Sequence, residues 1–98
     1  MSGDLKLTRV VRNTKGDKEF TAYFLKDGKE KITRFGTSSN FLLNSSKTEA
    51  DRKAYISRHK VNENWNDPTS AGALSRYLLW ETRSLTKNIR RFRKRYGV

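Results

Sequence analysis

An Asp-Gly pair at positions 27 and 28 constrains the fold of this chain more than any other feature of its sequence. The pair separates the aromatic-rich run EFTAYFL at 19–25 from a second run that ends at Phe35-Gly36. A type I′ hairpin turn needs positive φ at both central residues, and Asp-Gly is typical of such turns. The turn also sets the strand register. We therefore expect the cross-strand pairs Lys26–Lys29, Tyr23–Ile32 and Phe20–Phe35.

A further strand is predicted before this hairpin. Leu5 and Leu7 alternate with Lys6 and Thr8, which is the period of a strand that buries one face. A polar loop at 13–17 separates this run from the hairpin. The sequence therefore predicts an N-terminal antiparallel meander of about three strands over residues 5–36.

The segment 47–96 is expected to form about three helices that pack on this sheet. Ser46 and Glu49 fit a capping box for a helix from about 47 to about 62. Asp67-Pro68 fits the start of a second helix, because Pro is tolerated at the first helical position. The run AGALSRYLLW at 71–80 is apolar on more than one side, as in a helix central to a core or an interface. The expected fold class is α+β, in a single domain over 1–98.

The last predicted helix, 84–96, is amphipathic and strongly basic. Its apolar stripe consists of Leu85, Ile89, Phe92 and Tyr96, and Gly97 follows where a C-terminal cap is expected. Residues 83–98 hold seven basic side chains and no acidic one, which is more than half of the formal net charge of +12. Arg dominates this set, and its planar guanidinium suits bidentate contacts with phosphate.

These cations predict a contact surface for nucleic-acid phosphates. The candidate residues on the last helix are Lys87, Arg90, Arg91, Arg93, Lys94 and Arg95. Two other interpretations stay open: a solvated face kept basic for solubility, and a membrane-surface helix. The membrane interpretation is the less favoured, because a chain this short needs the apolar stripe for its core.

A second basic run, RKAYISRHK, lies at 52–60. Its candidate nucleic-acid contacts are Arg52, Lys53, Arg58 and Lys60. An ordinary exposed helix surface is the alternative, because consecutive charges around a helical turn cannot all face one ligand. The lysines around the hairpin tip are open to a similar alternative, since they also discourage edge-to-edge pairing of strands.

Little in the sequence points to catalysis or to a cofactor. The chain has no Cys, and His59, its one histidine, has only Glu63 as an acidic neighbour at helical spacing. Nucleophile motifs, glycine-rich phosphate loops and paired carboxylates are absent from the sequence. We therefore expect a protein that is not an enzyme and uses no metal or cofactor. No run approaches the roughly 20 apolar residues of a membrane span, so no membrane insertion is expected.

The segment RKAYISRHKVNENWNDPTSAGALSRYLLW at 52–80, preceded by DGKEKITRFG, resembles an uncharacterised family of small basic proteins. Large double-stranded DNA viruses of algae and amoebae encode that family. The resemblance covers roughly 20–96 and departs most between Gly36 and Ser46. It implies a viral setting, with the protein in the virion and in the cytoplasm or nucleus of the infected host cell.

Two hypotheses for function follow. In the first, the protein is virion-associated and uses its basic last helix to bind nucleic acid, with DNA favoured over RNA, or an acidic protein surface. In the second, it is a minor capsid protein that cements larger capsid proteins. The apolar residues proposed for such a protein interface are Phe41, Leu42, Leu43, Trp65 and Trp80.

Overall fold

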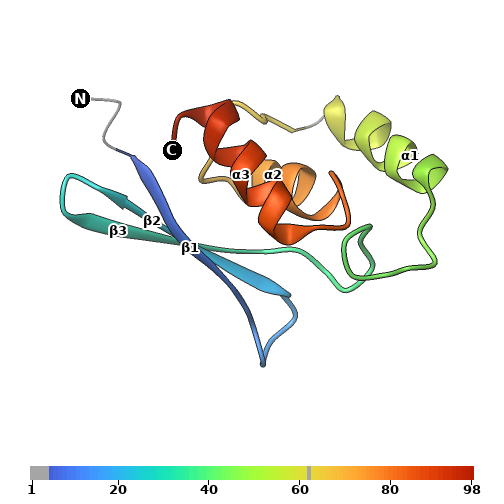
Figure 1. Cartoon of the computed structure of the whole chain (residues 1–98), viewed down its shortest axis with the longest axis horizontal. Coiled ribbons are helices and arrows are strands. Elements are labelled where there is room, and N and C mark those ends of the chain that lie inside the picture. Colours follow the sequence, from blue (N-terminus) through green and yellow to red (C-terminus); the bar gives the residue numbers. More distant parts are fainter. Residues whose placement is uncertain (1–4, 62) are drawn as a thin grey trace.

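The computed structural model describes residues 5–61 and 63–98, and it shows a three-stranded sheet followed by helices. The strands are β1 (Lys6–Arg12), β2 (Phe20–Lys26) and β3 (Lys29–Phe35), paired antiparallel in the order β1-β2-β3. The α+β class and the N-terminal meander are thus confirmed. Figure 1 shows the helices gathered on one side of this sheet.

The β2–β3 hairpin has the predicted turn and register. Asp27 and Gly28 both have positive φ, 53° and 77°. The Cα partners include all of the pairs expected from the turn: Lys26–Lys29, Tyr23–Ile32 and Phe20–Phe35. A register shift between Leu7 and Arg9 interrupts the pairing of β1 with β2. The local turn chemistry therefore determines the hairpin, as expected for a two-residue connection.

The core lies between one face of the sheet and two of the helical segments, α2–η2 and α3 (Leu85–Tyr96). Segment α2 (Ala71–Leu74) runs directly into η2 (Ser75–Leu79), which has the wider π-helical winding. Phe24, Leu78 and Phe92 are at most 1% exposed and represent the sheet, η2 and α3 in this core. The C-terminal end of the chain lies beside β1, where the Leu7 N–H donates to the Val98 carbonyl.

Helix α1 (Glu49–Lys60) lies at the periphery, at the end of the molecule away from the hairpin tip (Figure 1). None of its residues is buried. It is held instead by its half-buried side, where the Tyr55 ring stacks on Trp80 at a centroid distance of 4.2 Å. The thin apolar seam of this helix thus attaches it to Trp80, directly after η2, and no residue of the helix is buried.

Two helix starts differ from the sequence prediction. The capping box of α1 joins Thr48 to Asp51, so α1 begins at 49 in place of 47; it ends at Lys60, and the expected end at 62 lies outside the described residues. Ser46 is unavailable as a cap, because its amide and hydroxyl both donate to the Asn44 side chain. Asp67-Pro68 forms a turn in which Asp67 accepts from Thr69, and α2 begins later, after a Ser70 cap.

Candidate nucleic-acid interface

The structure places the basic face of α3 on the surface. Ser84 caps the helix by accepting from the Lys87 N–H, and Gly97 ends it with a φ of 68°. Phe92 is buried, while Leu85, Ile89 and Tyr96 are half-buried against the core. The six cations named as candidates on this helix are all exposed: Lys87, Arg90, Arg91, Arg93, Lys94 and Arg95.

Tertiary contacts divide these cations into two groups. Arg91 pairs with Glu81 at 3.2 Å, Arg93 donates to the Leu7 carbonyl at 3.0 Å, and Arg95 lies 4.3 Å from the Tyr77 ring centroid. By contrast, the side chains of three cations form no ion pair, hydrogen bond or aromatic contact within residues 5–61 and 63–98: Lys87, Arg90 and Lys94. Their spacing of three and four residues places them along one face of α3. We name these three residues the α3 ridge.

A groove of about 420 Å³ borders this ridge. It lies between β1 and α3, and Arg90 belongs to both the ridge and the groove lining. Arg9 and Arg93 also line it, beside Val10 and Ile89. The Arg9 guanidinium lies 4.0 Å from the Tyr23 ring centroid, and that of Arg93 donates to the Leu7 carbonyl. Cations gathered along a concave surface concentrate a positive field, which favours a polyanionic partner. Sequence patterns do not point to Arg9, because β1 and α3 lie at opposite ends of the chain.

The second basic run does not act as one surface. Arg52 donates to the Trp80 carbonyl at 2.9 Å and pairs with Glu49 and Glu81, and only 19% of its side chain is exposed. Its guanidinium is therefore occupied within the fold, and we withdraw it as a nucleic-acid contact. The other candidates are exposed and lack an acidic partner in the described part of the chain: Lys53, Arg58 and Lys60.

The Glu81 carboxylate accepts hydrogen bonds from three arginines. One of its oxygens accepts from Arg52 at 3.1 Å and from Arg76 at 2.9 Å, and the other accepts from Arg91. Burial raises the pKa of Glu81, whereas the hydrogen bonds and charges of Arg76 and Arg52 lower it. The lowering effects together are larger, so the pKa of Glu81 lies below the ordinary 4.5. This network neutralises arginines that would otherwise add to the basic surface.

Most of the residues proposed for a protein interface are packed against other residues of the fold. Phe41 is 8% exposed and Trp80 is 7% exposed, so both belong to the core and are withdrawn as interface candidates. Leu42 and Leu43 are half-buried and pack against that core. Trp65 is also half-buried, with its indole N–H donating to Glu63 at 3.2 Å. A continuous apolar interface does not emerge from these five side chains.

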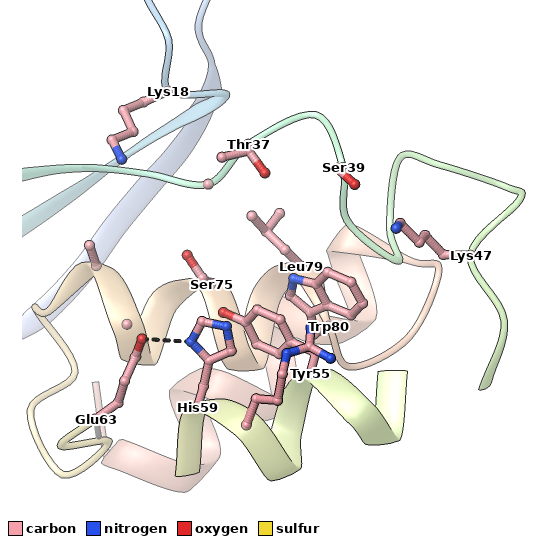
Figure 2. A pocket seen from close by; sticks show the side chains of 14 residues that line it. Lys18, Thr37, Ser39, Lys47, Tyr55, His59, Glu63, Ser75, Leu79 and Trp80 are labelled. Carbon is pink, nitrogen blue, oxygen red and sulfur yellow. Dashed lines mark hydrogen bonds and ion pairs between the residues drawn. The ribbon is translucent and has the colours of Figure 1, made fainter. Parts of the chain in front are cut away.

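A second concavity, which no sequence motif indicated, lies among α1, η2 and the segment after β3 (Figure 2). Its volume is about 470 Å³, and its lining includes Arg58, His59 and Ser75. Most of its lining residues fall within 52–80, the segment that carries the resemblance to the viral family. The charged and hydroxyl side chains of that segment were the only sequence signal for this pocket. The folding of the segment against residues 36–39 is a tertiary contact that the sequence pattern does not contain.

Comparisons of the chain with family models, with curated proteins and with solved structures find no match. The resemblance to the viral family therefore stays a prediction. No helix in the described residues is long and apolar enough to cross a membrane. Within those same residues, His, Asp and Glu side chains do not gather in groups of three or more that could hold a metal ion.

Proposed function

We propose that this protein binds the sugar-phosphate backbone of nucleic acid through the α3 ridge and the adjoining β1–α3 groove. The observation that carries the proposal is the set of exposed ridge cations, Lys87, Arg90 and Lys94, which form no ion pair in the described residues. Cations that neutralise phosphates release condensed counterions, and this release drives binding. In the viral setting that the resemblance implies, the polyanion is the packaged DNA.

The contacts available favour the backbone over the bases. An α-helix can enter the major groove, but base recognition needs side chains directed to base edges. The ridge holds no Asn, Gln, Asp or Glu that could read adenine or cytosine edges, and its Lys and Arg contacts to phosphate position a protein on the duplex without reading its sequence. We therefore expect binding with little sequence preference.

The experiment is a salt titration of affinity for a fluorescent DNA duplex, measured by anisotropy. The test variant replaces Lys87, Arg90 and Lys94 with Ala. The matched control replaces three exposed lysines at the β2–β3 hairpin with Ala: Lys26, Lys29 and Lys31. Both variants lose the same formal charge, so a difference between them reports the location of the contact.

The slope of log affinity against log salt should flatten by about 2.7 in the ridge variant, because each lost phosphate contact contributes about 0.9 on B-DNA. The hairpin variant should keep nearly the full slope. A parallel titration with single-stranded DNA and with RNA establishes which form is preferred. Equal flattening in the two variants, or no binding at low salt, would refute the proposal.

A further inference from the structure

The concavity beside α1 has the composition of an anion site that is separate from the α3 ridge. It shares no lining residue with the β1–α3 groove. Figure 2 shows Lys18, Thr37, Ser39 and Lys47 on one side of it, with Tyr55, His59 and Ser75 on the other. These side chains come from the β1–β2 loop, the segment after β3, α1 and η2.

The charges that line this pocket are mostly positive. Lys18, Lys47 and Arg58 form no ion pair within the described ranges 5–61 and 63–98. The one lining carboxylate is Glu63, and its two oxygens are occupied. One lies 3.0 Å from His59 Nδ1, and the other accepts from the Trp65 indole. The pocket lining therefore contains three cations that form no ion pair in the described part of the chain and one carboxylate whose oxygens are already hydrogen-bonded.

Neutral donors add directional contacts to these charges. In Figure 2 the Ser75 hydroxyl points into the pocket, and it forms no hydrogen bond within the described residues. A Ser inside a helix often bonds back to a carbonyl of the preceding turn, so a hydroxyl that instead faces a cavity is available to a ligand. Ser75 also begins η2, and π-helical turns are frequent at functional sites.

The aromatic residues beside the pocket restrict the kind of ligand. The Tyr55 ring lies between His59 and Trp80, with centroid distances of 4.0 and 4.2 Å. Both faces of Tyr55 are thus covered, and a base cannot stack on it. Burial and the nearby Glu63 charge raise the pKa of Tyr55 to about 12, so its phenol stays protonated at neutral pH.

We infer that this pocket binds a phosphate monoester, held by the Arg58 guanidinium and the Ser75 hydroxyl in the positive field of Lys18 and Lys47, which Figure 2 places at opposite ends of the pocket. Unoccupied cations and hydroxyl donors around a concave site match the charge and the acceptor oxygens of phosphate. Two kinds of ligand carry such a phosphate group: a free small phosphate compound and the terminal phosphate of a nucleic-acid strand. This inference does not depend on the function proposed for α3.

The test follows amide chemical shifts by NMR while inorganic phosphate or adenosine monophosphate is added, with adenosine as the control ligand. Saturable shifts should centre on Ser75 and His59, and adenosine should cause none. Arg58→Gln should weaken phosphate binding about tenfold, the factor expected for a hydrogen bond between charged groups. Lys60→Gln is the matched control, because it removes an equal charge from the same helix outside the pocket.

Ser75→Ala tests the directional contact and should weaken phosphate binding several-fold without changing the net charge. The source is distinguished by comparing 5′-phosphorylated and unphosphorylated oligonucleotides in the variant that lacks the α3 ridge cations. Preference for the phosphorylated strand assigns the pocket to strand ends, and binding of the small phosphates alone assigns it to a free ligand. Equal weakening by Arg58→Gln and Lys60→Gln, or the absence of saturable shifts, would overturn the inference.

Discussion

Replacing Glu81 with Gln should destabilise this protein more than any other single loss of a negative charge in its described part. The Glu81 side chain is 18% exposed, and it joins Arg52 and Arg76, which are 19% and 12% exposed. Gln keeps the size and one acceptor oxygen but removes the charge. Arg76 would then remain largely buried without a counterion, and Arg52 would keep only the exposed Glu49.

The structure sets the size of this effect. Breaking a fully buried ion pair costs about 3–5 kcal/mol, and the partial exposure of Glu81 lets water offset part of that loss. We therefore expect the free energy of unfolding to fall by about 2–3 kcal/mol. For a domain of this length, that change lowers the melting temperature by about 10–15 °C.

Glu49→Gln provides the control for this prediction. Glu49 also pairs with Arg52, at 2.8 Å, but its side chain is 57% exposed. An exposed pair contributes about 0.5 kcal/mol or less. Urea titrations followed by tryptophan fluorescence and by circular dichroism measure both variants. If the two lose equal stability, our reasoning that burial makes Glu81 critical is refuted.

The pH dependence gives an independent check on Glu81. Because its pKa in the folded protein lies below the ordinary 4.5, the carboxylate contributes full stability above that pH and loses the contribution as pH falls through the lowered pKa. The difference in stability between the parent protein and Glu81→Gln should therefore shrink from pH 7 to pH 3. An unchanged difference would contradict the assigned charge state.

Two further substitutions test the packing. Gly36 and Gly28 both have positive φ, but a Cβ at Gly36 would overlap the buried Leu79 side chain, whereas the space around Gly28 is open. Gly36→Ala should therefore cost about 1–3 kcal/mol more than Gly28→Ala in urea titrations, and equal costs would contradict this packing. The Asn88 side chain is fully buried and bonds three backbone groups, so Asn88→Ala should cost about 2–4 kcal/mol, against less than about 0.5 kcal/mol for the exposed Thr86→Ala. Thermal melts of this pair should differ, and similar melting temperatures would show that the Asn88 hydrogen bonds contribute little.

The features that the sequence predicted are those set by neighbouring residues. The Asp27-Gly28 turn determines its own hairpin register, because both required φ values belong to the two residues themselves. The apolar stripe of α3 likewise follows from helical spacing, and Phe92 within it is buried as that pattern indicates. Gly97 ends this helix in the expected left-handed conformation.

Helix starts were less predictable because competing caps are similar in sequence. Ser46 with Glu49 and Thr48 with Asp51 both fit a capping box, and the choice depends on Asn44, which occupies the Ser46 amide and hydroxyl. The Arg83 guanidinium also donates to backbone carbonyls of this loop, including that of Phe41. Such contacts join residues about 40 positions apart, so local patterns do not contain them.

The sequence by itself determined the three-stranded meander, the amphipathic last helix and the concentration of charge near the C-terminus. Only the tertiary structure decided which cations are free, because Glu81, the Leu7 carbonyl and the Tyr77 ring come from other elements. It also created the pocket beside α1 by folding 36–39 and η2 against Arg58 and its neighbours. The physical reason is the same in both cases: charge is a property of each residue, but its compensation depends on which groups the fold brings within reach.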